Sequence, residues 1–178
     1  MPSGGHPDVM PRYRRYFRDG QTVFLTLATH GRYPWMADDA ACNMVLASLR
    51  AAKQRHPFRH HAHVLLHDHL HLMISPYPGV EIPALIGCFK RAALSRLHHI
   101  APATRRLCQP RYHDHIVRDE NDFARHLDYL HFNPVKHGLA QHAGAWRWSS
   151  LAAWQLRGVY APTWGHTPPD HMDDIRES

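Results

Sequence analysis

Two apolar-rich runs, residues 59–66 and 69–75, are separated only by His67 and Asp68. This short separation constrains the fold more than any other feature of the chain. Runs of strand length joined by a two-residue connection are typical of an antiparallel hairpin with a tight turn. We therefore expect an antiparallel sheet with this hairpin inside it.

The first half of the chain supplies further elements for that sheet. Residues 22–29 alternate in polarity and are rich in β-branched side chains, which predicts a strand. Apolar residues at helical spacing predict a helix over 38–55, begun by Asp38 or Asp39 as a cap. The same spacing predicts a second helix over 81–99.

The second half adds one strand and one helix. A short strand is expected near 113–118, followed by a helix capped by Asp119 or Asn121. We expect that helix to end or kink at Asn133, because Pro134 disfavours helical conformation in the preceding residue. The order β-α-β-β-α-β-α is a split β-α-β plan with one extra helix, and it predicts a ferredoxin-like (RRM-like) α+β sandwich with an antiparallel sheet.

At 178 residues the chain fits one compact domain. We expect a flexible arm over 1–11, a domain over 12–140 and a Trp-rich tail over 141–178 that packs on it. The apolar runs are too short for a membrane span, and no apolar stretch near the first residue suggests a signal peptide. Three isolated cysteines suit a reducing cytoplasm and form no zinc-type cysteine cluster.

The charge of the chain is unevenly distributed. The formal net charge is +6, yet four acidic residues and one arginine fall within the last nine residues. The remaining body carries 20 basic and 11 acidic residues, a balance of +9. Such a body favours nucleic acid as a partner, although an acidic membrane surface or protein would also attract it.

A pair of histidines opens the second run of the hairpin. On a strand, residues i and i+2 face the same way, so His69 and His71 would project side by side while Leu70 packs behind them. Two such imidazoles can take adjacent positions around one divalent ion. A plain pair of histidines is the alternative, because this chain has 19 histidines and repeats the spacing at His61 and His63.

The last predicted helix carries a tyrosine on a polar stripe. Phe123, Leu127 and Leu130 fall in one narrow sector, which we take as the core face. Tyr129 lies about 120° from that face. We therefore expect it outside the core, on a stripe shared with Asp122, His126 and Asn133. A surface tyrosine at the sheet edge is the alternative.

Together the two features supply the parts of one reaction. A phenol has a pKa of about 10 and is a poor nucleophile at neutral pH. A divalent cation can polarise a phosphate and assist its attack by a phenolate. Two imidazoles and one amide oxygen suit Mg²⁺ or Mn²⁺ with substrate bound, and Zn²⁺ also fits this set.

Residues 68–71, Asp-His-Leu-His, resemble the His-hydrophobe-His signature of the HUH nucleases. Residues 128–138, Asp-Tyr-Leu-His-Phe-Asn-Pro-Val-Lys-His-Gly, closely resemble the stretch around the nucleophilic tyrosine of REP-associated tyrosine transposases. The likeness covers roughly residues 12–165 in the same order. The Asn-Pro-Val-Lys-His-Gly string is specific, whereas a His-x-His pair is not.

The resemblance implies a function for each of these residues. Tyr129 would be the nucleophile of a transposase that cleaves and rejoins single-stranded DNA at REP-type hairpins through a 5′-phosphotyrosine. His69, His71 and Asn133 would bind Mg²⁺ or Mn²⁺. The protein would act as a monomer or homodimer in the bacterial cytoplasm, associated with the nucleoid. One departure is visible, since members of the family often have proline where this chain has His67.

Cations and aromatic residues elsewhere would hold the DNA. Cations can track phosphates, and aromatic rings can stack on bases. The candidates are Arg12, Arg14, Arg15, Lys90, Arg91, Lys136, Trp146 and Trp148. Taken singly, each also fits a solvated charge or a packed tryptophan.

Three other functions fit part of the sequence. The first is a non-catalytic nucleic-acid-binding module of ferredoxin-like fold, which would not need Tyr129. The second is a zinc hydrolase using His69 and His71, for which no acidic base stands at short spacing. The third is a histidine-rich metal buffer, which explains the composition but not the Asn-Pro-Val-Lys-His-Gly string.

Overall fold

The computed structural model describes residues 20–98, 106–170, 172 and 175. Four strands form one antiparallel sheet in the order β2-β3-β1-β4. They are β1 (Val23–Ala28), β2 (Phe58–Leu65), β3 (His69–Pro76) and β4 (His113–Ile116). The expected hairpin is therefore present as β2 and β3.

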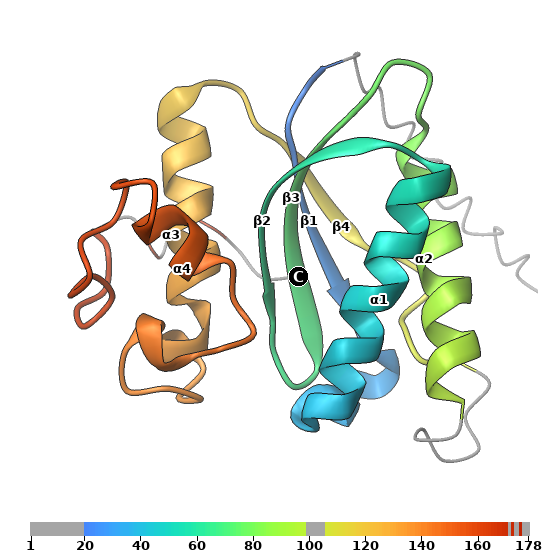
Figure 1. Ribbon diagram of the computed structural model, residues 1–178, viewed down its shortest axis with the longest axis horizontal. Coiled ribbons are helices and arrows are strands. Elements are labelled where there is room, and N and C mark those ends of the chain that lie inside the picture. Colours follow the sequence, from blue (N-terminus) through green and yellow to red (C-terminus); the bar gives the residue numbers. More distant parts are fainter. Residues whose placement is uncertain (1–19, 99–105, 171, 173–174, 176–178) are drawn as a thin grey trace, which may run out of the picture.

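Helices lie on both sides of this sheet (Figure 1). On one side are α1 (Asp39–Arg55) and α2 (Ile82–Leu97), and on the other are α3 (Glu120–Lys136) and the short α4 (Leu151–Gln155). The described part of the chain also contains short 3₁₀ helices over His30–Arg32, Trp35–Ala37 and Ala143–Ala145. The predicted β-α-β-β-α-β-α order and the ferredoxin-like α+β fold are both confirmed.

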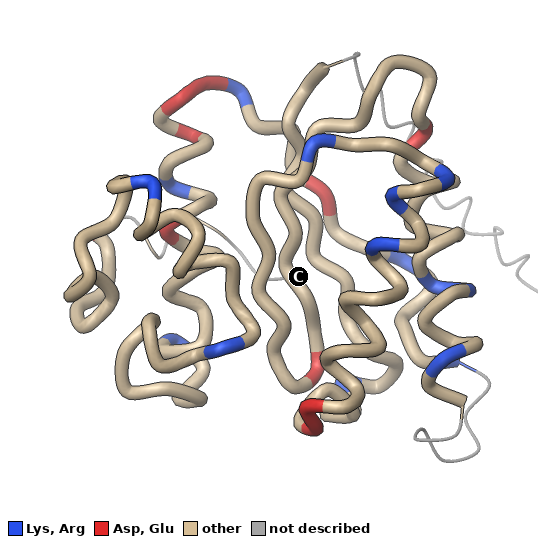
Figure 2. Tube along the Cα trace, in the orientation of Figure 1, with Lys and Arg blue, Asp and Glu red and all other residues tan. Residues whose placement is uncertain are grey.

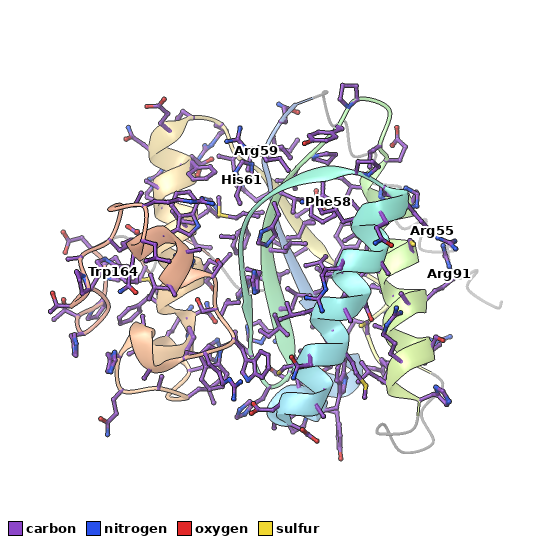
Figure 3. The ribbon with its side chains drawn as sticks, viewed as in Figure 1. Arg55, Phe58, Arg59, His61, Arg91 and Trp164 are labelled. Atoms are coloured by element: carbon purple, nitrogen blue, oxygen red, sulfur yellow. The ribbon has the colours of Figure 1, made fainter. Side chains whose placement is uncertain are left out.

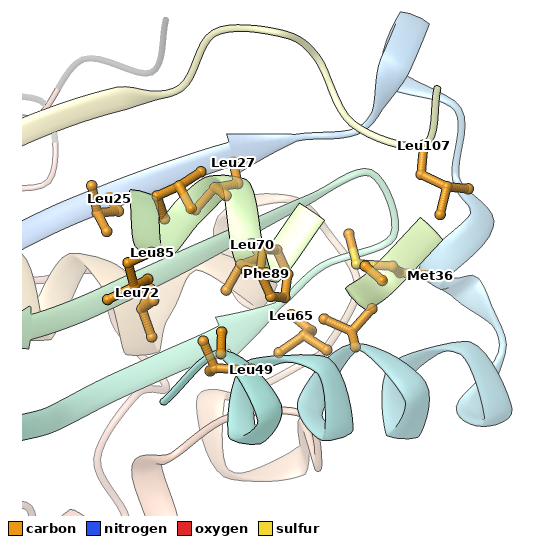
Figure 4. Close-up of a cluster of buried hydrophobic side chains, with 14 of the residues drawn as sticks. Leu25, Leu27, Met36, Leu49, Leu65, Leu70, Leu72, Leu85, Phe89 and Leu107 are labelled. Carbon is orange, nitrogen blue, oxygen red and sulfur yellow. The ribbon is translucent and has the colours of Figure 1, made fainter. Parts of the chain in front are cut away.

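Strand alternation divides the buried side chains into two clusters. Leu25 of β1 and Leu72 of β3 face α1 and α2, where they meet Leu49, Leu85 and Phe89 (Figure 4). The intervening residues face α3, where the second cluster includes Phe24, Met73 and Leu130. Because β3 also alternates, the odd-numbered residues that it presents to α3 are His69, His71 and Met73.

The far edge of β2 is covered by the chain that follows α3. The backbone N–H of Leu65 donates to the carbonyl of Trp148 at 2.8 Å, and Val64 bridges to Ser149. The Trp146 indole donates to the Leu65 carbonyl at 2.8 Å. These bonds satisfy backbone groups that an exposed edge strand would leave open to pairing with another chain.

The end of α3 differs from the prediction. The helix does not stop at Asn133 but continues through Pro134 to Lys136. Gly138 follows the cap residue His137, and its φ of 67° is one that glycine adopts without a steric penalty. The N–H groups of Gly138 and Leu139 bond to the carbonyls of Val135 and Pro134, which is a Schellman ending. Pro134 has no backbone N–H, so it removes one hydrogen bond from the last helical turn. The Schellman bonds satisfy the carbonyls of that turn instead.

Charge is also distributed between the two sides. Lysines and arginines are spread along α1 and α2, whereas acidic residues gather at the start of α3 (Figure 2). That start is capped by Asp119, whose carboxylate accepts from the N–H of Asp122 at 2.8 Å. Within the described part of the chain, no helix combines the length and apolar character needed to cross a membrane.

Candidate active site

His69 and His71 lie side by side in the layer between the sheet and α3. Their ring centroids are 4.8 Å apart, and the planes are close to perpendicular at 83°. Their exposed fractions are 1% and 0%, so the pair is fully buried. Leu70 and Leu72 pack on the opposite face of the sheet, as the strand alternation predicts.

Each of these histidines is held through Nδ1. His69 Nδ1 donates to the Asp68 carboxylate at 2.6 Å, and His71 Nδ1 shares a hydrogen bond of 2.9 Å with the Thr26 hydroxyl. Thr26 stands directly opposite His71 on β1. Metal-binding histidines almost always use their second nitrogen in this way, which fixes the tautomer and the ring orientation. The arrangement therefore fits a pair that would bind a cation through Nε2.

Tyr129 faces the same layer. Its ring centroid lies 5.5 Å from that of His71 and 6.0 Å from that of Phe24. The polar stripe predicted for α3 is present, but its expected position outside the core is wrong. Tyr129, Asn133 and Asp122 are at most 1% exposed. The stripe is buried because the sheet beneath it also presents polar and aromatic side chains, against which these residues pack.

Lys136 and His137, which follow Asn133 in the Asn-Pro-Val-Lys-His-Gly string, also lie close to the site. The Lys136 ammonium lies 4.8 Å from the centre of the Tyr129 ring and donates to the Tyr129 hydroxyl at 3.4 Å. The His137 ring lies 5.1 Å from that of His69. Sequence reasoning did not single out His137, although it is part of the same string.

Among the described cations expected to bind DNA, those of α2 lie away from this layer. Arg12, Arg14 and Arg15 lie outside the described residues. Lys90 and Arg91 belong to α2, across the sheet from α3, and Figure 3 shows Arg91 at the outer side of that helix. The Lys90 ammonium donates to the carbonyls of Gln109 and Pro110, at 2.6 and 3.1 Å, so it holds a loop of the protein.

The two tryptophans expected to stack on bases contact the protein itself. Trp148 is 9% exposed, and its indole donates to the Asp39 carboxylate at 2.8 Å. Trp146 is half-buried, and its ring lies 5.7 Å from that of His67. Among the predicted DNA contacts that the structure describes, Lys136 is therefore the one that lies beside Tyr129.

A second polar group lies farther along the same layer. His115 of β4 stands opposite Phe24, and its ring stacks on that of His126 with a centroid distance of 4.3 Å. Asp122, one turn before His126 on α3, accepts from His115 Nε2 at 2.8 Å. The sequence places Asp122 and His126 at i, i+4 on one stripe of the predicted helix. Its spacing does not indicate that His115 lies close to them.

An RRM-like antiparallel sheet with a His-x-His strand beneath a helix that carries a tyrosine is consistent with the HUH-type fold expected from the sequence. Comparison with known proteins adds the particular group. No family model matches the sequence. A protein of Haemophilus influenzae provisionally described as a REP-associated tyrosine transposase is 28% identical over 169 residues, covering 89% of this chain and 96% of its own. The REP-associated tyrosine transposase of Escherichia coli K12 is 28% identical over 155 residues, covering 87% of this chain and 91% of its own.

A solved structure agrees with these relatives. It is a REP-associated tyrosine transposase bound to a REP hairpin, and it superimposes with a TM-score of 0.80 at 26% identity. The match covers 90% of this chain and 94% of the solved one. The resemblance to REP-associated tyrosine transposases that the sequence indicates is therefore confirmed over most of the chain.

Proposed function

We propose that this protein is a divalent-metal-dependent transposase that cleaves and rejoins single-stranded DNA at REP-type hairpins, with Tyr129 as the nucleophile. The observation that carries the proposal is the packing of Tyr129 against His71, whose neighbour His69 completes the histidine pair. The two segments lie far apart in the sequence. The similarity to a protein solved with a REP hairpin supports this choice of DNA.

The residues suggest a division of labour. His69 and His71, with Asn133 as the third ligand, would hold Mg²⁺ or Mn²⁺, and the second nitrogens bonded to Asp68 and Thr26 keep the two rings in place. The ion, when bound, would polarise the scissile phosphate and neutralise its charge. Packing against neighbouring rings holds Tyr129 in one orientation, which lowers the entropic cost of attack.

The chemistry is an exchange of phosphoesters. The Tyr129 oxygen forms a bond to phosphorus as the bond from phosphorus to the 3′ oxygen breaks. The phenol proton is lost and the departing 3′ oxygen gains one, leaving a 5′-phosphotyrosine and a free 3′-hydroxyl. Attack by a 3′-hydroxyl on that linkage reverses the step and rejoins the DNA. No oxidant or nucleotide is consumed, so the reaction can run in either direction.

We also propose a place for the reaction and a division of the chain into a catalytic unit and two flanking segments. Hairpins of chromosomal DNA would be met in the bacterial cytoplasm, at the nucleoid. Residues 12–140 would form the catalytic unit after an arm over 1–11. Residues 141–178 would stabilise that unit by covering the edge of β2, for which the Trp146 and Trp148 contacts to Leu65 give support.

Covalent capture tests the proposal. The protein is incubated with Mg²⁺ or Mn²⁺ and a single-stranded REP hairpin labelled at its 5′ end or, separately, at its 3′ end. Denaturing electrophoresis should reveal a protein adduct that retains the 3′ label only. The adduct should be absent with Tyr129→Phe and with a chelator.

Tyr160→Phe is the matched control. Tyr160 is also buried beside α3, and its hydroxyl donates to Asp128 at 2.6 Å, so the variant removes a buried hydroxyl away from the histidine pair. It should form the adduct. Tight hairpin binding by the wild-type protein without any adduct would favour the non-catalytic binding module instead. An adduct that retains the 5′ label would contradict the 5′-phosphotyrosine.

A further inference from the structure

We propose that His115, Asp122 and His126 form a second metal site, separate from the histidine pair of β3 and suited to Zn²⁺ rather than Mg²⁺. The inference is independent of the proposed DNA chemistry. It rests on three side chains that the fold brings together from β4 and α3.

The geometry is close to that of a formed site. One nitrogen of each histidine and one oxygen of Asp122 lie within 4.8 Å of one another. His115 Nε2 is 2.8 Å from Asp122 Oδ2. His126 Nδ1 is 3.1 Å from Asp122 Oδ1 and donates to the backbone carbonyl of Asp122 at 2.8 Å. Zn²⁺ binds nitrogen and oxygen at about 2.0–2.2 Å, so ligands at tetrahedral angles stand roughly 3.3–3.5 Å apart. Binding an ion would require His126 to give up its bond to the Asp122 carbonyl, or to turn its Nε2 toward the ion, and the three ligand atoms to settle at tetrahedral spacing.

The surroundings favour an ion that prefers nitrogen ligands. The Asp122 and His126 side chains are only 2% and 7% exposed, whereas His115 is 31% exposed and gives access from solvent. Imidazole nitrogens suit Zn²⁺ and similar transition metals, while Mg²⁺ prefers an octahedral shell of oxygens.

A cavity of about 270 Å³ borders the three ligands and is also lined by His113, Arg118 and Arg125. It has room for water or an anion at the positions that the protein does not fill. Arg118 donates to Asp122 through its Nε at 3.1 Å and through its backbone N–H at 3.0 Å. Burial raises the pKa of the Asp122 carboxyl, but the hydrogen bonds from Arg118 and His115 outweigh it and leave that pKa well below its ordinary value.

An ion here would fix the helix that carries Tyr129. His126 lies three residues before Tyr129 on α3, and His115 belongs to the edge strand of the sheet. Phe24 contacts the rings of both His126 and His71, at centroid distances of 5.0 and 5.2 Å, so it lies between the two metal sites. We expect bound Zn²⁺ to raise the melting temperature by tying α3 to β4.

The test uses the full-length His69→Ala/His71→Ala protein, which lacks the histidine pair of β3. Zn²⁺ is measured by equilibrium dialysis with metal analysis, in the presence of excess Mg²⁺. We expect one tightly bound Zn²⁺ per chain and a higher melting temperature with Zn²⁺ than with a chelator. Adding His115→Ala and His126→Ala should abolish both effects. Adding His113→Ala instead should preserve both, since His113 lines the same cavity but does not belong to the group of three.

Two results would overturn the site. One is the absence of tightly bound Zn²⁺ in the His69→Ala/His71→Ala protein. The other is a loss of Zn²⁺ binding on adding His113→Ala that equals the loss on adding His115→Ala and His126→Ala. X-ray absorption of the Zn²⁺-loaded His69→Ala/His71→Ala protein decides the question if the variants of His115 and His126 fail to fold. A first shell with two imidazoles and a carboxylate supports the site. A shell of three or more imidazoles would mean that histidines elsewhere in the chain hold the ion, and would also overturn it.

Discussion

Lys136→Met should slow DNA cleavage by weakening the activation of Tyr129. The Lys136 ammonium lies 3.4 Å from the phenol oxygen, where it would stabilise a developing phenolate. At that separation two unit charges interact by about 5 kcal/mol at an effective dielectric constant of ~20, and by about 1 kcal/mol in water. Lys136 is exposed and the phenolate is only partly formed during attack, so we expect a loss of about 1.5–3 kcal/mol. Since about 1.4 kcal/mol is a factor of ten, cleavage should slow by about 10-fold to 100-fold.

The measurement is single-turnover cleavage of a labelled REP hairpin with saturating protein, from pH 6 to about pH 10. Losing a nearby positive charge disfavours the phenolate. The rise of the rate with pH should therefore move to higher pH in Lys136→Met, and the deficit should shrink in alkaline buffer. Lys136→Arg keeps the charge and should retain most of the activity.

A second readout separates activation from DNA binding. If Lys136 only contacts a phosphate, Lys136→Met should weaken hairpin affinity and its salt dependence while leaving the saturated rate and its pH profile unchanged. That outcome would refute the reasoning about phenolate stabilisation. A wild-type rate at saturation, with an unshifted pH profile, is thus the decisive negative result.

Three other changes have expected outcomes. The double variant His69→Ala/His71→Ala should lose metal-dependent cleavage yet still bind the hairpin in a gel-shift assay; loss of binding would instead point to a folding defect. Phe24→Ala, at a position 2% exposed, should lower the free energy of unfolding by about 3–5 kcal/mol in a denaturant titration; a loss below about 1 kcal/mol would contradict its packing between the two polar groups. Burial lowers the pKa of His63 to about 4 and of His131 to about 3. Because the unfolded chain takes up these protons from pH 6.5 downward while the folded one does not, stability should fall between about pH 6.5 and 4, by about 2 kcal/mol per histidine near pH 5. Substituting both residues should flatten that dependence, and an unchanged slope would mean that other groups cause it.

Local patterns in the sequence were sufficient to predict the fold. The hairpin was visible because only two residues separate its runs, and its strands are Phe58–Leu65 and His69–Pro76. Two caps were also predictable, since Asp38 and Asp119 accept from N–H groups of the helices that they begin. The end of α3 was not predictable from Pro134, because the penalty of a proline within the last turn depends on how the following residues close the helix.

The candidate site was predictable only in part. A helical wheel identifies which residues share a stripe, but not what packs against that stripe. Tyr129 was therefore expected outside the core, although the polar face of β1 and β3 makes its burial favourable. Trp148 is a similar case, because its partner Asp39 lies 109 residues away in the sequence. His115 was missed for the same reason, since only its position opposite Phe24 brings it to Asp122.

The burial of Tyr129 bears on how DNA would reach it. A fully buried phenol cannot meet a phosphate unless a neighbouring group moves, and Lys136 is an exposed neighbour whose ammonium lies over the Tyr129 ring. A phosphate is a stronger partner for an ammonium than a neutral hydroxyl, so an incoming strand would draw Lys136 off the ring. The same movement would expose the tyrosine and place a positive charge beside the scissile phosphate. Lys136 would then contact DNA and activate Tyr129 in one step, which accounts for its position two turns after the nucleophile.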